Sequence, residues 1–336
     1  MTASIETLRQ RAAIIQAIRE FFIENGFLEV ETPTLATSPG MDPYLNAFET
    51  VYHPEFTSPT STQTLYLPTS PEFHMKRLIG RGCGNIFQIC RSFRNGETGS
   101  LHQPEFTMIE WYRSGESYTK IMEDVENLFS YTARKALSIT SILRNDKHIN
   151  LLPSWERLTV KQAWLNFTGI DLDICSTVKD LLAEGRRIGV ENLKTDDSWD
   201  TLYFKIFLGR IEPYLGKDAP LILYEFPADM AALSRLKPSD PSVALRFEVY
   251  IDGVEICNAF DELTDPDIQR TRFDEARALQ KSLGKKPFPL DEQFIAALEK
   301  GLPACSGIAL GVDRMVMLLL NKQTIQEVLA FPFTEK

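Results

Sequence analysis

Cationic, aromatic and acidic residues follow one another within a short stretch of the chain. They are Arg91, Arg94, His102, Glu105, Phe106 and Glu110. Arginine holds phosphate oxygens in a bidentate fork, and an aromatic ring can stack on a nucleotide base. The order therefore suits the binding of a nucleoside triphosphate. For one such stretch taken alone, solvated charges on a surface hairpin are the simpler explanation.

Two predicted strands must position these groups. Residues 86–93 mix β-branched, aromatic and polar residues, and residues 105–112 form a second run that is predicted as a strand. The segment 95–103 between them is rich in Gly, Ser, Thr and Asn, which is typical of a long hairpin loop.

A second predicted hairpin carries two carboxylates. Asp252-Gly253 lies between β-rich runs and is a strong signal for a two-residue turn. With that turn, Glu248 pairs with Cys257, and Glu248 and Glu255 become diagonal neighbours about 7–8 Å apart on one face. Carboxylates at this spacing can converge on one Mg²⁺, which prefers a few carboxylates plus phosphate oxygens. Two solvated charges on an exposed face explain the pattern equally well.

The residues that follow require an irregularity in the second strand of that hairpin. Strict alternation sends Asn258, Phe260 and Glu262 to the face opposite Glu255. If all of them line one pocket, a bulge or bend must lie near residues 257–259.

Two helix starts carry further candidates. Pro71 suits the first turn of a helix, with Thr69 or Ser70 as its cap. Glu72 then lies in that turn, where an acidic residue is most often only a partner of the helix dipole. Near the C-terminus, Arg314 lies in the first turn of an apolar helix, where the dipole disfavours a cation. A nearby phosphate or base would explain this arginine, and so would a structural salt bridge.

Composition favours a globular protein of the cytoplasm. The 336 residues carry a net charge of −10 and are 43% hydrophobic, which allows a large core and argues against a broad nucleic-acid surface. No apolar run approaches the roughly 20 residues of a membrane span. The N-terminus lacks the apolar core of a signal peptide. The five cysteines form no CxxC pair, which suits reduced thiols better than disulfides or zinc.

The remaining periodicity indicates several helices in one domain. Helical patterns cover residues 5–25, 118–137, 160–167, 177–185 and 199–211. Residues 138–220 carry no catalytic pattern and are interpreted as a helical insertion in a single domain over residues 1–336. Residues 37–63, rich in Ser, Thr and Pro, are predicted as a surface loop.

Three segments resemble the motifs of class II aminoacyl-tRNA synthetases, in the same order. GFLEVETP is similar to motif 1, FRNGETGSLHQPEFTMIE to motif 2 and GIALGVDR to motif 3. TSPEFHMKR, HQPEFTMIEWY and EICNAFDEL resemble the catalytic core of lysyl-tRNA synthetases. The resemblance spans most of the chain and implies an α+β fold, with an antiparallel sheet flanked by helices and a homodimer interface at motif 1.

The resemblance also implies roles in binding ATP. Arg94 would hold the α-phosphate and the amino-acid carboxylate, and His102 would approach the outer phosphates. Phe106 and Arg314 would enclose adenine. The ATP-binding set implied in this way is Arg94, Asn95, Gly96, Glu97, His102, Gln103, Phe106, Glu255, Ile256, Gly311 and Arg314, of which Arg94, His102 and Arg314 are the catalytic residues.

Metal and amino-acid sites follow from the same resemblance. Glu248 and Glu255 would bind Mg²⁺, Glu110 would lie near the α-amine, and Asn258 would lie near the carboxylate. The implied amino-acid set is Ser70, Pro71, Glu72, Glu110, Tyr112, Asn258, Phe260, Glu262 and Ala309. Several acidic groups suit a diamino acid, because a buried ammonium needs a paired charge.

Two departures from lysyl-tRNA synthetases resemble a truncated paralogue. Only 25 residues precede Gly26, so we expect no N-terminal anticodon-binding domain. Ala309 stands where those synthetases usually carry Gly and adds a methyl group beside the amino-acid site. The paralogues that lysylate elongation factor P share both features, and there the alanine accompanies acceptance of (R)-β-lysine. Harmless packing variation is the alternative explanation for Ala309.

Two further residues depart from motif 2. The pattern expects Glu two residues after Arg94, where this chain has Gly96 followed by Glu97. Glu97 must then reach ATP from a shifted loop. Gln103 replaces a usual Asn.

The resemblance implies an ATP-dependent ligase. It would activate (R)-β-lysine or lysine as an adenylate and transfer it to a lysine of elongation factor P, with tRNA charging not expected. Electrostatic stabilisation of the phosphate charge would supply most of the catalysis. Two alternatives remain open, namely a minimal lysyl-tRNA synthetase-like enzyme and a non-catalytic nucleotide-binding regulator, which Gly96 motivates.

Overall fold

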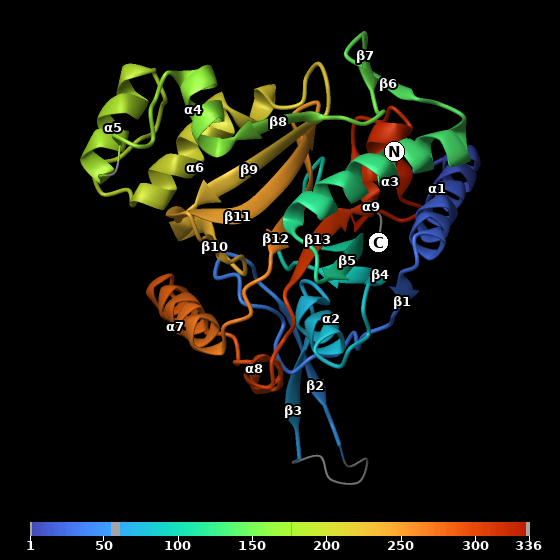
Figure 1. Ribbon diagram of the computed structural model, residues 1–336, viewed down its shortest axis with the longest axis horizontal. Helices are drawn as coiled ribbons and strands as arrows, with labels where there is room; N and C mark the ends of the chain where they lie inside the picture. The colour runs from blue at the N-terminus through green and yellow to red at the C-terminus, as the bar shows by residue number, and fades with distance from the viewer. Residues whose placement is uncertain (1, 55–60, 176, 334–336) are drawn as a thin grey trace.

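A mixed sheet of nine strands forms the centre of the computed structural model, which describes residues 2–54, 61–175 and 177–333 (Figure 1). The strand order is β1-β4-β5-β13-β12-β11-β9-β8, with β10 beside β11. The strands are β1 (Leu28–Glu29), β4 (Ile86–Phe93), β5 (Glu105–Ser114), β8 (Glu156–Thr159), β9 (Leu221–Pro227), β10 (Leu236–Lys237), β11 (Asp240–Ile251), β12 (Val254–Asp261) and β13 (Cys305–Gly311). Neighbours are antiparallel except for β1 with β4 and β8 with β9.

Helices surround this sheet, and the predicted α+β class is confirmed. Within the described residues the α-helices are α1 (Ile5–Glu24), α2 (Glu72–Ile79), α3 (Tyr118–Leu137), α4 (Val160–Thr168), α5 (Val178–Arg187), α6 (Trp199–Arg210), α7 (Pro266–Ser282), α8 (Glu292–Glu299) and α9 (Val312–Leu319). Short 3-10 helices are η1 (Glu212–Tyr214), η2 (Ala228–Met230) and η3 (Ile325–Val328). None of the helices in the described part of the chain is long and apolar enough to cross a membrane.

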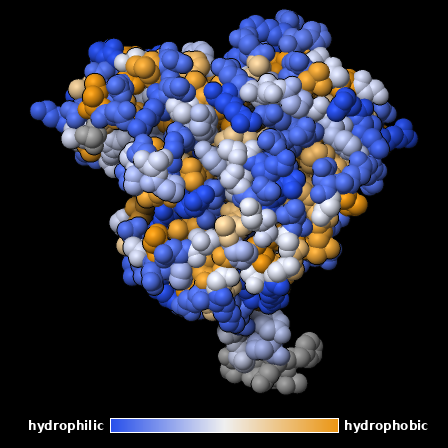
Figure 2. Space-filling view, viewed as in Figure 1, coloured by the Kyte–Doolittle hydropathy of each residue, from blue (hydrophilic) through white to orange (hydrophobic). Residues whose placement is uncertain are grey.

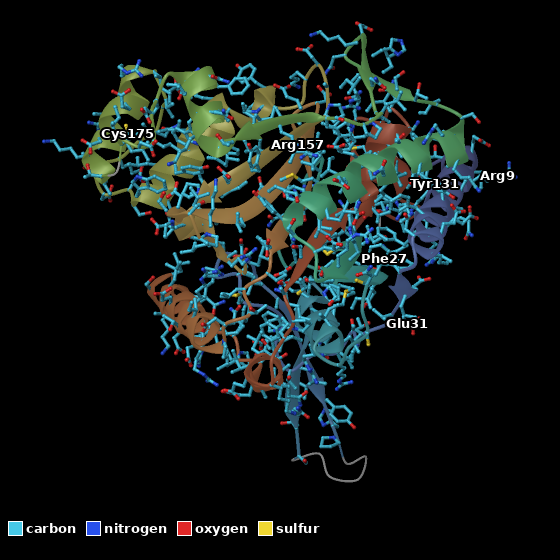
Figure 3. All side chains as sticks on the ribbon, viewed as in Figure 1. Arg9, Phe27, Glu31, Tyr131, Arg157 and Cys175 are labelled. Carbon is cyan, nitrogen blue, oxygen red and sulfur yellow. The ribbon has the colours of Figure 1, made fainter. Side chains whose placement is uncertain are left out.

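Alternation along the strands gives the sheet two different faces. On β5, Ile109 and Trp111 are fully buried in the main core, to which α1 and α3 also contribute. Their neighbours Glu110 and Tyr112 point to the other face. A hydrogen bond of 2.9 Å from Tyr131 on α3 to Glu24 joins the two core helices (Figure 3). One face is therefore covered by helices, and the other is free to form a cleft.

The β11–β12 pair contains the bulge that the sequence requires. Tyr250 pairs with Glu255, but Glu248 lies opposite Asn258 and not opposite Cys257. The predicted pairing of Glu248 is therefore wrong, because β12 has one extra residue directly after Glu255. The bulge lies just before the stretch where it was expected. It places Glu248, Glu255 and Asn258 on one face of the sheet.

Helix α2 begins at Glu72. This residue therefore lies in the first turn of the helix, as predicted. Pro71 is the N-cap residue and not part of the first turn, so its predicted place is wrong by one position. The Ser70 hydroxyl accepts a hydrogen bond of 3.0 Å from the Glu72 amide. Neither Thr69 nor Ser70 is the N-cap residue, so that prediction is wrong, although Ser70 satisfies the first amide of the helix.

The segment 138–220 is helical only in its second part. Strands β6 (Ser141–Arg144) and β7 (Lys147–Asn150) form a hairpin, and β8 joins the central sheet. Arg157 on β8 lies 3.2 Å from Glu126 on α3 (Figure 3). The helices α4, α5 and α6 then gather at one corner, where Figure 2 shows hydrophobic residues scattered among hydrophilic ones. The description of this segment as a helical insertion stays a prediction.

The stretch predicted as a surface loop contains a hairpin instead. Strand β2 (Phe48–Tyr52) pairs with β3 (Gln63–Leu67), and the pair projects from one end of the molecule (Figure 1). Residues 55–60 of this stretch lie outside the described residues.

The Asp252 turn anchors the β6–β7 hairpin to the sheet. The carboxylate of Asp252 lies 2.9 Å from Arg144 Nε and 2.8 Å from Lys217 Nζ, and the side chains of Asp252 and Arg144 are almost fully buried. Burial alone would raise the pKa of Asp252, but the hydrogen bonds from Lys217 and Arg144 outweigh it and lower the pKa. The ion pairs of Asp252 therefore stabilise the folded protein fully above the ordinary pKa of aspartate. This stabilisation is lost as the pH falls through the folded-state pKa.

We expect Asp252→Ala to lower the free energy of unfolding by about 3 kcal/mol, because it leaves Arg144 buried without its charge partner. Asp252→Asn tolerates the left-handed turn and should cost less. Urea denaturation at several pH values measures both. The difference between wild type and Asp252→Asn should shrink below about pH 4, and a difference that grows with acidity would contradict this account.

Candidate active site

A cleft of about 620 Å³ lies on the face of the sheet away from α1 and α3. The predicted site residues that line it are Ser70, Glu72, Arg94, Glu97, His102, Gln103, Phe106, Glu110, Tyr112, Glu248, Glu255, Ile256, Asn258, Phe260, Glu262, Ala309, Gly311 and Arg314. Pro71, Asn95 and Gly96 do not line it. Segments far apart in the sequence therefore meet at one cleft.

One end of the cleft is a buried acidic pocket around Lys76. The Lys76 ammonium lies 2.5 Å from a carboxylate oxygen of Glu72 and 2.5 Å from one of Glu262. Glu110 belongs to the same group, because it lies within electrostatic reach of Glu72 and Glu262. Lys76 is 0% exposed, Glu110 is 1% exposed and Glu262 is 2% exposed. Two carboxylates therefore pair with Lys76, and a third, Glu110, lies within electrostatic reach of it.

Burial and mutual repulsion govern the protonation of this pocket. Burial raises the pKa of Glu110 to about 8, and the neighbouring charge of Glu72 adds to the shift. Burial alone would lower the pKa of Lys76, but the carboxylates of Glu262 and Glu72 outweigh it and raise the pKa. Lys76 is therefore charged at neutral pH, while Glu110 is poised to lose its proton when another cation enters.

Hydrogen bonds and close packing fix the walls of this pocket. Glu110 accepts a hydrogen bond of 2.5 Å from Ser70 and one of 3.1 Å from the Tyr112 hydroxyl. Opposite Tyr112, a Cβ atom at Gly307 would lie 2.2 Å from the tyrosine ring and 2.6 Å from Glu262. Ala309 pairs with Glu110 on the neighbouring strand, so its methyl group lies beside the pocket.

Arg314 and His102 form part of the other end of the cleft. Arg314 donates hydrogen bonds to the carbonyl oxygens of Glu255, at 2.7 Å, and Leu101, at 3.3 Å. Its Nη2 lies 2.8 Å from His102 Nε2, which must accept because a guanidinium only donates. Burial and the charge of Arg314 lower the pKa of His102. A cation in the first helical turn is thus explained by its partners across the cleft.

The motif 2 loop brings Glu97 into the cleft where Gly96 does not reach. Gly96 has a φ of +89°, which disfavours the side chain expected at that position. Glu97 lies 3.7 Å from Arg94, and the Arg94 guanidinium lies 5.2 Å from the centre of the Phe106 ring. An acidic group therefore lies beside Arg94 in the cleft, although Gly96 itself does not line it.

The carboxylates of Glu248 and Glu255 face the same side of the cleft and suit a hard cation such as Mg²⁺. Burial raises the pKa of Glu248, and the charge of Glu255 adds to the shift. A third carboxyl, Glu212, stands within electrostatic reach, since burial and these two charges raise its pKa to about 7. Within the described residues, no group of three His, Cys, Asp or Glu side chains is arranged to hold a metal ion by itself. A cation here would need oxygen ligands from a bound molecule.

Sequence reasoning missed two charged residues of the site. Lys76 lies four residues after Glu72 in a predicted helix, and this spacing places the two side chains on one face. Arg246 precedes Glu248 by two residues in a predicted strand, so the two share a face. Both spacings are visible in the sequence and could have identified these two local pairs. The contacts of Lys76 and Arg246 with residues far along the chain could not be found in this way.

The fold and this site define a class II aminoacyl-tRNA synthetase domain. The sequence pattern of class II tRNA synthetases (D, K and N) matches residues 2–335, and the chain belongs to this family. Among curated proteins it is similar to the elongation factor P–(R)-beta-lysine ligase of Vibrio vulnificus, at 42% identity over 99% of this chain and 97% of that protein. The proteins of the same name from Vibrio cholerae and Klebsiella pneumoniae strain 342 are 41% and 42% identical over at least 98% of this chain and 96% of theirs. The resemblance inferred from the sequence is confirmed.

The close contact at Gly307 makes a direct prediction. Gly307→Ala should lower the free energy of unfolding by about 1–3 kcal/mol, because the new methyl group displaces Tyr112 in a packed site. Gly311→Ala is the matched control, since its Cβ would lie 3.7 Å from the Arg314 side chain, an ordinary contact. Urea denaturation compares the two variants. Equal stabilities would show that Tyr112 is not held against Gly307.

Proposed function

We propose that this chain uses ATP to activate (R)-β-lysine or lysine and transfers the aminoacyl group to a lysine side chain of elongation factor P. The observation that carries the proposal is the buried pocket in which Glu72 and Glu262 pair with Lys76 and Glu110 lies within electrostatic reach. The pocket has more carboxyl groups than fixed cations, so it can pair with the ammonium groups of a diamino acid. The names of relatives that match nearly the whole chain support the acceptor.

The amino acid would lie between the acidic pocket and the arginine-lined end of the cleft. Glu110 would receive one ammonium group and would lose its proton on binding, since its pKa is raised to about 8 in the free pocket. Arg94 and Asn258 would face the carboxylate. The reacting carboxylate would then be directed toward the phosphates.

ATP would occupy the end of the cleft near Arg314. Phe106 and Arg314 would enclose adenine, Arg94 would hold the α-phosphate and His102 would approach the outer phosphates. Glu248 and Glu255 would hold Mg²⁺, which when bound neutralises charge on the phosphate oxygens. Glu97 supports this assignment, because it supplies an acidic group in the cleft despite Gly96.

The proposed reaction has two steps. An oxygen of the amino-acid carboxylate attacks the α-phosphorus of ATP, the bond to the β-phosphate bridging oxygen breaks, and pyrophosphate leaves. The neutral ε-amine of the acceptor lysine then attacks the carbonyl carbon, an amide forms, AMP leaves and the amine loses a proton. Arginine side chains aimed at the developing phosphate charge lower the barrier of the first step.

We further propose that the chain forms a homodimer through the face around α1 and β1. Exposed hydrophobic side chains there support it, since Ile23 is 59% exposed and Leu28 is 53% exposed. Motif 1 lies on this face. A role in modifying a translation factor agrees with a cytoplasmic location and with the five free cysteines. Transfer to tRNA is not part of the proposal.

ATP–pyrophosphate exchange with lysine, (R)-β-lysine and no amino acid tests the first step. We expect exchange to depend on an added lysine, and Arg314→Ala to reduce it by at least 100-fold, a loss of about 2.7 kcal/mol in transition-state stabilisation. Arg270→Ala is the control, because Arg270 is an exposed arginine on α7 that pairs with Glu292. Undiminished exchange in Arg314→Ala would refute the role of this arginine. Absence of exchange in the wild type would refute the function.

The methyl group of Ala309 makes a prediction about specificity. Ala309 lies between Glu110 and Asn258 in the sheet, so its methyl group limits the space where the α-carbon of the substrate would lie. Ala309→Gly should shift the ratio of kcat/KM for lysine over (R)-β-lysine toward lysine by about tenfold, the effect of one methyl group. Steady-state exchange kinetics measure this ratio. An unchanged ratio would remove Ala309 from the determinants of specificity.

A further inference from the structure

Arg246 is held in place by several contacts, and none of the roles proposed above explains them. Its Nε donates a hydrogen bond of 3.0 Å to Asn258 Oδ1, its Nη1 one of 2.8 Å to the Met230 carbonyl and its Nη2 one of 2.5 Å to Glu248. All three nitrogens of the guanidinium are engaged with three different elements. Such a network defines one position for the side chain.

Aromatic rings complete the enclosure of Arg246. The guanidinium carbon lies 4.5 Å from the centre of the Phe226 ring and 5.8 Å from that of Phe260. Only 18% of the side chain is exposed. Contacts with the faces of aromatic rings attract a planar cation and keep it in place. Arg246 nevertheless lines the cleft, so it forms part of the wall and not of the core.

The contact with Asn258 determines which way the amide faces. A guanidinium has only donors, so Asn258 must turn its carbonyl oxygen toward Arg246. The amide nitrogen is then directed elsewhere, and Asn258 itself lines the cleft beside Ala309. An amide held in this orientation presents hydrogen-bond donors to a ligand. Donors favour a carboxylate over a neutral or cationic group.

We infer that Arg246 is a positioning residue that makes Asn258 a selective donor for the carboxylate of the amino-acid substrate. This inference rests on the proposed function, and it adds a reason why the site accepts an amino acid and rejects the corresponding diamine. Arg246 does not touch the substrate. It acts through the orientation of the Asn258 amide.

The test compares lysine with cadaverine, which keeps two amines on a five-carbon chain but has no carboxylate. Binding to the full-length protein is measured by calorimetry without ATP or metal, so that the proposed role of Glu248 in holding a metal ion does not affect the result. Arg246→Lys keeps the charge but cannot make three planar contacts. We expect it to weaken lysine binding by about 10- to 100-fold, the loss of a hydrogen bond to a charged group, and cadaverine binding by less than threefold.

A double-mutant cycle separates positioning from a general structural role. If Arg246 acts through Asn258, Arg246→Lys should have no further effect on lysine binding in the Asn258→Ala background. Additive losses, or equal losses for lysine and cadaverine in the single variant, would overturn the inference. Thermal denaturation identifies a variant that fails to fold, and Phe226→Leu then replaces it, because loss of the ring beneath the guanidinium should produce the same selective loss.

Arg235→Lys is the matched control. Arg235 makes paired hydrogen bonds of 2.6 and 2.9 Å to Asp261 on the same sheet, but it does not line the cleft. Its substitution should leave both affinities unchanged. A wild-type protein that binds neither lysine nor (R)-β-lysine would refute the proposed function and with it this inference. A wild type that binds lysine, with Arg246→Lys unaffected, would refute the inference alone.

Discussion

The ion pairs of Lys76 are the interaction on which the site depends. A charged group buried without a partner destabilises a protein strongly, yet this pocket contains three carboxylates within its walls. Lys76, which is fully buried, lies 2.5 Å from both Glu72 and Glu262 and connects α2 to the end of β12. One cation offsets part of the acidic charge and leaves the rest available. The pocket is stable enough to form and remains attractive to a further cation.

Geometry in the sheet provides the second constraint. Without the bulge after Glu255, that carboxylate and Asn258 would lie on opposite faces, and no single cleft could use both. The extra residue shifts the pairing register between β12 and β11 by one residue. Glu248 thereby becomes the direct neighbour of Asn258, which is also the geometry that lets Arg246 contact both side chains. A local irregularity thus connects the proposed metal site to the proposed amino-acid site.

Local patterns in the sequence predicted most of the architecture. Periodicity located α1 and α3 to α6, and the Asp252-Gly253 turn located the β11–β12 hairpin, because these signals depend only on neighbouring residues. The membership of β8 in the central sheet and the β2–β3 hairpin were not predicted. They depend on partners far along the chain. Lys76 and Arg246 were missed for the same reason, since their importance arises from carboxylates and amides that only the fold brings near them.

In the motif 2 loop an acidic side chain lies beside Arg94 even though Gly96 stands at the expected glutamate position. Gly96 takes a backbone conformation in which a glutamate would be strained. Glu97 reaches Arg94 from the next position, and Arg94 in turn lies near the Phe106 ring. The proposed function requires a carboxylate beside this arginine. A loop of small and polar residues can satisfy that requirement from either of two adjacent positions, whereas the strands that carry Glu110, Glu248 and Asn258 allow no such shift, because a one-residue slip would turn each side chain away from the cleft.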